Sequence, residues 1–329
     1  MSNLEQEKQL IRATKPFARE ERARSWWYTI STFGLIIVAF FGIFSPTPLW
    51  AKIISSIVLG LTLIRFFIIY HDYAHNSILQ DSLVAKWLFA FFGLYILAPL
   101  SIWRRSHDHH HQHNSKLYTS SIGSYPIVTK EKFLSASRKE QRLYLFARHP
   151  LTILFGYIFV FIGGMCIRSL MNNPKRHWDS ALSLLVHVLT GVIMFMAAGW
   201  TGLLLGLILP SFIAFSMGAY LFYAQHNFPG VFFADKNGWT YINAAMLSSS
   251  YMTMNPVMHW FTGNIGYHHI HHLNAKIPFY RLPETYHAIP ELQNAKTTSL
   301  NPRDIIACFR LKVWDVEQQK MVSLHEAYQ

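Results

Sequence analysis

Long apolar runs alternate with short polar segments along this chain. Each run extends for about 17–22 residues, which at 1.5 Å per residue approaches the roughly 30 Å thickness of the hydrocarbon core of a bilayer. The runs are 28–44, 49–70, 83–102, 151–170, 181–200 and 203–223. This pattern predicts an integral membrane protein built from helices.

Two pairs of these runs are expected to form membrane hairpins. The uncharged residues 45–48 separate the first two runs, and only Thr201 and Gly202 separate the last two. Links this short join elements that lie side by side and antiparallel. We therefore expect four spanning helices.

Three clusters of histidines lie at or near the ends of apolar runs. They read HDYAH at 71–75, HDHHH at 107–111 and HHIHH at 268–272. Because residues at i, i+3 and i+4 share one face of a helix, the first cluster offers two imidazoles on one face and each of the others offers three. The ligand candidates from this spacing are His71, His75, His107, His110, His111, His268, His271 and His272.

So many imidazoles exceed the four ligands of a tetrahedral zinc ion. They suit two metal ions of higher coordination number, and iron is among the metals that imidazole binds. A histidine-bound pair of irons at a membrane surface indicates oxygen chemistry on a lipid. The alternative, a set of surface or metal-scavenging histidine tracts, is disfavoured because the helical spacing recurs in all three clusters.

A shared site constrains the topology, because all three clusters must then lie on one side of the membrane. The run 83–102 separates the first two clusters, so we expect it to be buried, re-entrant or interfacial rather than spanning. Lys175 and Arg176 favour the cytoplasm for the segment before the fifth run, so 151–170 is not expected to cross fully. The predicted fold class is an all-α integral membrane protein with about four transmembrane helices in two hairpins, further interfacial or re-entrant helices, and a cytoplasmic histidine-rich cap.

The composition agrees with a membrane protein. Hydrophobic residues make up 51% of the 329 residues and charged residues 14%, against about 25% charged in soluble domains. Much of the net charge of +12 lies in the N-terminal segment and in 103–150, which indicates a positive-inside bias rather than nucleic-acid binding. A docking surface for an acidic redox partner is the alternative for this charge. Cys166 and Cys308 are too few for an iron–sulfur cluster and imply no disulfide framework.

The chain is expected to form one domain over residues 1–329. Residues 1–27 lack the apolar stretch of a signal peptide and are predicted to be a cytoplasmic N-terminal segment. Residues 273–329 are mixed in charge and contain several prolines, so we predict a cytoplasmic cap of short helices and loops.

Over residues 15–292 the chain resembles the membrane fatty acid desaturase family, in particular its bacterial Δ12/ω6-type members. The three clusters match the family motifs HxxxH, HxxHH and HxxHH in that order. The segment QHNF at 225–228 looks like the additional QHxF element of the family, and the resemblance implies that His226 is a ninth ligand. Many relatives follow this element with acidic residues, where this chain has Pro229 and Gly230.

The resemblance implies two non-haem iron ions, O2 as co-substrate, and a fatty acyl lipid or acyl thioester as substrate. Asp72 and Asp108, each beside a ligand, are expected to orient histidine N–H groups. Asn264 and His259 are candidates for holding a metal-bound water or for capping a helix. No GxGxxG follows a strand, so we expect electrons from a separate ferredoxin-like or cytochrome-like protein. The expected location is a bacterial inner membrane, with the active site facing the cytoplasm.

The remaining histidines are expected to have other roles. His109, His113 and His269 flank the ligands but project from other faces of a helix. His187 lies inside an apolar run and is expected to be hydrogen-bonded between helices. Surface positions are expected for His149, His177, His287 and His325.

The leading hypothesis is a desaturase that inserts a cis double bond into an acyl chain. An unactivated methylene has no acidic proton, so acid–base groups and nucleophiles cannot attack it, whereas an iron pair with O2 can. One alternative is a lipid or carotenoid hydroxylase or ketolase on the same scaffold. Another is a membrane metal transporter, which is disfavoured because the clusters fall at the ends of spans rather than near the midplane.

Overall fold

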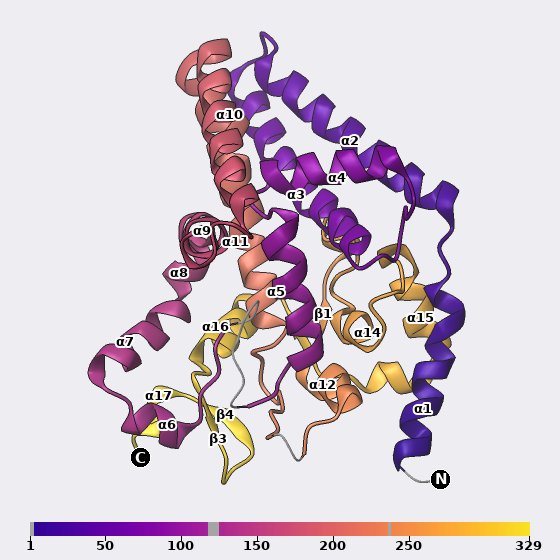
Figure 1. Ribbon diagram of the computed structural model, residues 1–329, viewed down its shortest axis with the longest axis vertical. Helices are drawn as coiled ribbons and strands as arrows, with labels where there is room; N and C mark the ends of the chain where they lie inside the picture. Colours follow the sequence, from indigo (N-terminus) through magenta and orange to yellow (C-terminus); the bar gives the residue numbers. More distant parts are fainter. Residues whose placement is uncertain (1–2, 118–124, 236–237) are drawn as a thin grey trace.

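The computed structural model describes residues 3–117, 125–235 and 238–329, and helices dominate it (Figure 1). The first elements are α1 (Asn3–Thr14), η1 (Lys15–Ala18), α2 (Arg22–Phe44), α3 (Leu49–Ala74), α4 (Leu83–Tyr95), α5 (Leu100–His113), α6 (Lys130–Ser135), α7 (Arg138–Ala147) and α8 (Pro150–Leu154). They are followed by the π-helix η2 (Tyr157–Arg168), α9 (Ser169–Asn172), α10 (Trp178–Leu203), a short π-helical stretch η3 (Leu204–Ile208) and α11 (Leu209–Ala224).

Short elements make up the rest of the chain. The helices are α12 (Tyr241–Ser248), α13 (Pro256–Phe261), α14 (His268–Leu273), η4 (Phe279–Arg281), α15 (Leu282–Ala288), η5 (Pro290–Asn294), α16 (Pro302–Arg310) and α17 (Leu324–Ala327). The strands are β1 (Tyr251–Thr253), β2 (Thr297–Ser299), β3 (Val313–Asp315) and β4 (Lys320–Val322).

The first predicted hairpin is formed by α2 and α3. These helices have 23 and 26 residues with mean hydropathies of 1.9 and 2.2, so both are long and apolar enough to cross a membrane. Gly42 permits their close approach, because a Cβ at this position would overlap Ser55 of α3. Exposed apolar side chains on α2 such as Trp27, Val38 and Phe41 are suited to contact lipid.

The second hairpin lies within residues Trp178–Ala224, which are helical except at one turn. The backbone leaves the helical conformation at Ala198 and at Gly199, whose φ is +58°. The chain reverses direction at this point. As a result, Gly191 before the turn packs against Leu203 and Leu207 after it, which a Cβ at Gly191 would contact. The predicted hairpin is therefore present, but its turn falls a few residues before the predicted Thr201–Gly202, where a glycine tolerates the positive φ.

The run 83–102, predicted as one helix, is divided between two. α4 and α5 meet at an angle of 90°, and Leu97 between them has a φ of 54°. Pro99 explains the break, because proline disfavours a helical conformation in the residue before it. Residues 100–102 therefore open the helix of the second histidine cluster, and α4 passes across α3 (Figure 1).

The run 151–170 is also broken. It yields α8 and then an apolar helix over Tyr157–Asn172, which is shorter than the candidate spans. In Figure 1 this helix, whose last turn is α9, is viewed end-on, whereas α10 runs vertically, so the two lie across one another. The prediction that this run does not cross fully agrees with this arrangement.

The chain after α11 forms a cap over the ends of α3, α5 and α11. The cap contains two small sheets that the sequence did not predict, one of parallel β1 and β2 and one of antiparallel β3 and β4. One apolar core extends from the long helices into this cap, since Leu59 of α3 and Leu292 of η5 belong to the same buried cluster.

Candidate metal centre

The first histidine cluster is positioned by the end of α3. His71 lies in its last turn and His75 caps it, so the two rings stand one turn apart with centroids 4.6 Å from each other. The Nδ1–H of His71 donates to Asp72 Oδ1 over 3.1 Å. This hydrogen bond leaves His71 Nε2 free to face the second cluster.

The second cluster occupies the last two turns of α5. His107 and His111 lie one turn apart with their Nε2 atoms separated by 3.1 Å, and His110 lies between them on the same side of the helix. The Nε2 of His107 is also 2.7 Å from that of His71. The helix α5 therefore presents its histidines to the end of α3.

The third cluster lies on the short helix α14 of the cap, and His226 follows the end of α11. The Nε2 of His271 is 3.0 Å from that of His111. The Nε2 of His226 lies 2.9 Å from that of His268 and 3.0 Å from that of His110. Four segments far apart in sequence thus direct their imidazoles to one place.

The nine histidines separate into two adjacent groups. Within each group the candidate ligand nitrogens all lie within 4.8 Å of one another. The five-histidine group is His71, His75, His107, His111 and His271, and the four-histidine group is His110, His226, His268 and His272. The rings of His111 and His272 stack at 4.2 Å, so the groups share a wall.

The donor set fits two bound cations. The Nδ1–H of His226 donates to the carbonyl of Ser248 over 2.9 Å, so its Nε2 carries a lone pair. That lone pair faces the Nε2 atoms of both His110 and His268, and it can accept a hydrogen from only one of them. The buried Nε2 of His75 has no hydrogen-bond partner among the described residues. A cation in each group would satisfy these converging lone pairs.

Burial keeps these imidazoles neutral. Removal from water disfavours the charged form and lowers the pKa of His226 to about 4. Burial and then neighbouring histidines hold the pKa values of His268, His271 and His272 well below the usual range. A neutral imidazole is the form that binds a metal.

The residues predicted to support the ligands lie in three different settings. Asp72 is buried and contacts His71, as described above. Asp108 is half-buried and lines a surface depression with Arg104, and among the described residues it has no hydrogen bond to a candidate ligand. Asn264 donates to the carbonyl of Phe279 over 3.2 Å, so it orders the segment after the third cluster rather than lying among the imidazoles.

The other histidines lie outside both groups. His109 and His113 stack on each other at 4.1 Å, and His269 is hydrogen-bonded through Nε2 to the carbonyl of Leu292. His259 stacks near Tyr267. His187 contacts the hydroxyl of Tyr157 between two helices, in agreement with its expected role.

His177 is not at the surface, where the sequence placed it. Its side chain is buried between Ser101 and Arg105 of α5, whereas His149, His287 and His325 are exposed. The contact depends on how α10 packs against α5, which the sequence does not reveal.

A groove of about 1130 Å³ reaches the five-histidine group. Its walls come from α3, α5, η2 and α11, and it extends from His107 to Leu63 on α3. Trp103 stacks on His107 with centroids 4.8 Å apart, and the ring of Phe222 lies 4.9 Å from that of His110. The groove is mainly apolar and can hold an extended hydrocarbon chain beside the candidate metal sites.

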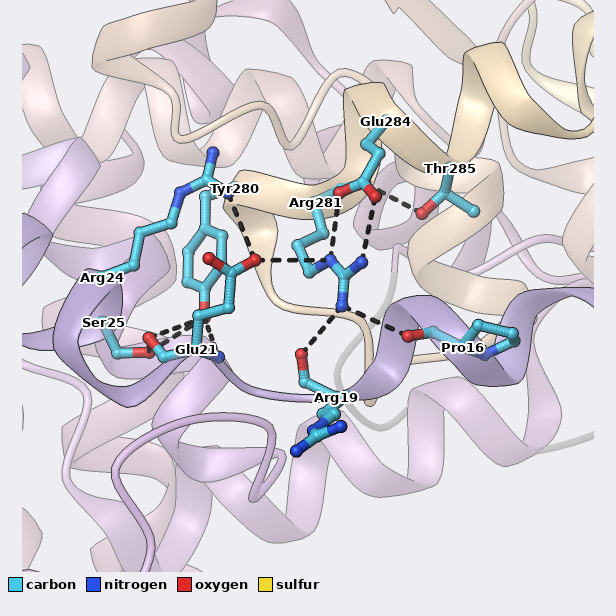
Figure 2. Close-up of polar contacts among 9 residues, drawn as sticks. All are labelled: Pro16, Arg19, Glu21, Arg24, Ser25, Tyr280, Arg281, Glu284 and Thr285. Carbon is cyan, nitrogen blue, oxygen red and sulfur yellow. Dashed lines mark hydrogen bonds and ion pairs between the residues drawn. The ribbon is translucent and has the colours of Figure 1, made fainter.

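Arg281 ties the N-terminal segment to the chain after the third cluster (Figure 2). Its guanidinium donates to the carbonyls of Pro16 and Arg19 over 3.2 and 3.1 Å. It also forms two hydrogen bonds of 3.0 Å with the carboxylate of Glu284. Beside it, the hydroxyl of Tyr280 accepts a hydrogen bond from the backbone N–H of Glu21. The segment before α2 is thereby fixed under the cap.

Comparison with known proteins gives consistent matches. A family model described as fatty acid desaturase matches residues 47–302. A fatty acid desaturase of Bacillus subtilis (strain 168) is 31% identical over 324 residues, which cover 96% of this chain and 90% of that protein. The sn-1 oleoyl-lipid 12-desaturase of Anabaena variabilis is 23% identical, with coverages of 83% and 78%. The chloroplastic omega-6 fatty acid desaturase of Arabidopsis thaliana is also 23% identical, over 80% of this chain and 57% of that protein.

Proposed function

Because the chain belongs to the fatty acid desaturase family, we propose that it inserts a cis double bond into a fatty acyl chain in a Δ12/ω6-like manner, with O2 and a histidine-bound pair of irons. The family makes the protein a membrane oxidoreductase that acts on fatty acyl lipids. The position of the bond is proposed from the activities for which the relatives in Anabaena and Arabidopsis are named.

The observation that carries the proposal is the junction of the groove with the histidine groups. His107 belongs to the five-histidine group and also lines the groove. A methylene lying beside His107 and Phe222 would therefore be held next to the proposed metals. An apolar wall around that methylene excludes water from the reacting segment of the chain.

The proposed ligands are the nine histidines of the two groups, and the proposed supporting residue is Asp72. When bound, the irons supply the O2 chemistry that removes two hydrogen atoms from an unactivated pair of methylenes. Asp72 fixes the tautomer of His71, and the carbonyl of Ser248 does the same for His226. Asp108 and Asn264, predicted as further supporting residues, are proposed to act through the fold around the site.

The proposed reaction needs a source of electrons besides the acyl chain. Reduction of O2 to two waters takes four electrons, of which the acyl chain gives two and an external donor gives two. We propose a ferredoxin-like or cytochrome-like donor that approaches from the cytoplasm, with the chain in a bacterial inner membrane. The basic residues before α2 support this orientation.

The test expresses the intact chain or its His110→Ala variant, with a ferredoxin reductant, in a bacterium that makes no polyunsaturated lipids. New diunsaturated chains with the intact protein alone, located by mass spectrometry, would support the proposal. His113→Ala serves as a control, because His113 lies outside both groups. Hydroxylated or oxo products would instead identify a hydroxylase or ketolase. Exchangeable zinc without two tightly held irons would contradict the metal centre.

A further inference from the structure

Four exposed arginines line either the groove or the open surface depression that adjoins it. Arg104 and Arg105 come from α5, Arg168 ends η2, and Arg176 precedes α10. Within residues 3–117, 125–235 and 238–329, no carboxylate lies within ion-pair distance of any of them. We call these four residues the arginine rim.

The arginine rim is continuous with the acyl groove. Arg105 and Arg168 line the groove itself, together with the amide side chains of Asn172 and Asn173. Arg104, Arg105 and Arg176 line an open depression that adjoins the groove at Arg105. Arg105 therefore belongs to both surfaces, and an anion bound here would lie at the mouth of the groove.

A hydrogen-bonded chain holds Arg105 in place. Its guanidinium can only donate, so the contact of 3.4 Å to His177 Nε2 makes this nitrogen an acceptor. His177 Nδ1–H then donates to the hydroxyl of Ser101, 2.8 Å away, and this hydroxyl donates to Asp179. The backbone N–H of Ser101 occupies the second oxygen of Asp179. The carboxylate is thus engaged by Ser101 and does not neutralise Arg105.

The surroundings of the arginine rim match the boundary between lipid and water. Ile167, Met171 and Trp178 are 42%, 77% and 62% exposed, although all three are large and apolar. They alternate in sequence with Arg168, Asn172 and Asn173. Apolar side chains beside snorkelling cations are typical of the headgroup level of a bilayer.

We propose that the arginine rim binds the phosphate of a glycerophospholipid whose acyl chain occupies the groove, which makes an intact anionic phospholipid the substrate. This inference rests on the proposed function. Guanidinium groups bind phosphate through paired hydrogen bonds, and each cation near an anionic lipid surface strengthens binding. An acidic protein donor is less favoured, because Arg105 and Arg168 line the apolar groove and exposed apolar residues surround them.

One further carboxylate bears on the charge of this surface. Asp108 lines the same depression as Arg104 and offsets one positive charge there. Asp108 is not among the residues that line the groove. The residues to substitute in the test are therefore the two arginines that do line it, Arg105 and Arg168.

The test reconstitutes the full-length, iron-loaded protein in vesicles that contain phosphatidylglycerol and diglucosyldiacylglycerol with identical but isotopically distinct acyl chains. Mass spectrometry measures the ratio of the two desaturated products. A second measurement, without reductant, quantifies each lipid retained by the purified protein. Both ratios should favour phosphatidylglycerol and should fall about five-fold for each arginine removed in Arg105→Gln and Arg168→Gln.

The controls separate this proposal from the others. Arg303→Gln changes an exposed arginine of the cap and should leave both ratios unaltered, and the double Arg→Lys variant should retain part of the preference. Unchanged ratios in the Arg105 and Arg168 variants would overturn the proposal. Abolition of the preference by excess inorganic phosphate, selective retention of oleoyl-CoA, or slower reduction by ferredoxin with an unchanged lipid ratio would overturn it as well.

Failure of the proposed function would look different. In that case the intact protein would form no double bond in either lipid, while the retained-lipid ratio would still report whether the arginine rim binds phosphate.

Discussion

Asp72 accepts a hydrogen bond of 2.7 Å from the backbone N–H of Phe279, a residue that lies 207 positions later in the chain. Its other oxygen accepts from His71, so one buried carboxylate joins the first histidine cluster to the segment after the third. Asn264 holds the carbonyl of the same Phe279. The backbone of Phe279 therefore links the cap to the end of α3.

Replacement of Asp72 by asparagine should disturb the tautomer of His71. The new amide can still accept from Phe279, but its NH2 group would then face His71 Nδ1 and favour a proton on Nε2 instead. That proton would remove the lone pair that faces the five-histidine group. We expect a loss of about 10–100-fold in iron affinity or activity, measured by metal analysis and product formation.

Asp108→Asn is the matched control for this change. It alters a half-buried carboxylate that also follows a histidine but faces the surface depression. An equal loss of iron in both variants would show that Asp72 has no special role in positioning His71.

Loss of His226 should affect one metal site more than the other. His226 is one of only four histidines in its group, whereas the five-histidine group is complete without it. We expect the iron content of His226→Ala to fall from about two irons per chain towards one, because fewer ligands bind a metal more weakly. Iron content by mass spectrometry checks this result, and His113→Ala should retain the full content. Retention of two irons by His226→Ala would exclude it as a ligand.

Gly218 should control how far an acyl chain can extend in the groove. It lines the groove on α11 one turn from Phe222, and a Cβ at this position meets no atom within 4 Å. The side chain of Gly218→Leu would enter the groove without displacing protein atoms. We expect about a ten-fold or greater loss of long-chain products, or a shift to shorter chains, in the product profile.

Gly34→Leu provides the comparison for Gly218→Leu. A Cβ at Gly34 of α2 also meets no atom within 4 Å, but this position does not line the groove. The same change in products from both variants would point to a general effect on the membrane helices.

Arg281→Gln should loosen the N-terminal segment. The variant loses the hydrogen bonds to the carbonyls of Pro16 and Arg19 shown in Figure 2, which we expect to lower the local free energy of opening by about 1 kcal/mol. Hydrogen exchange of residues 14–21 measures this change. Arg303→Gln should leave their exchange rates unaltered.

The same contact predicts a dependence on pH. Hydrogen bonds from Arg281 lower the pKa of Glu284 below its ordinary value of 4.5. The carboxyl of Glu284 thus binds its proton less readily in the folded protein than in the unfolded chain. The stabilisation of the folded state by this contact is therefore present near neutral pH, and it is lost as the pH falls below about 4.5 through the lowered pKa. Because Glu284 is half exposed, solvent screening limits the effect to about 0–1 kcal/mol. If the protection of residues 14–21 against hydrogen exchange stayed constant down to pH 3, that result would contradict this coupling.

The spacing of polar and apolar residues predicted much of the fold. The two hairpins follow from run lengths, and the eight candidate ligands follow from the i, i+3 and i+4 pattern, because both depend on local geometry. The family resemblance added His226. Pro99 and Gly199 were visible in the sequence, yet the 90° bend at one and the reversal at the other depend on neighbouring helices, so their positions were predicted less well.

Other features could not be predicted from local pattern. The division of the histidines into groups of five and four mixes the clusters: His111 and His271 lie in one group, while His110 and His272 lie in the other. Adjacent residues on α5 and α14 point to different sites because the two helices meet across the centre. The burial of His177 and the contact of Arg281 with Pro16 likewise join distant segments.

The sequence by itself therefore determined the class of protein, its membrane helices and the residues able to bind metal, because periodicity and residue chemistry are local properties. Only the tertiary structure decided which histidines share a site, how the groove reaches His107, and where the arginine rim lies. These relationships depend on packing between residues tens to hundreds of positions apart, as the bond from Phe279 to Asp72 illustrates.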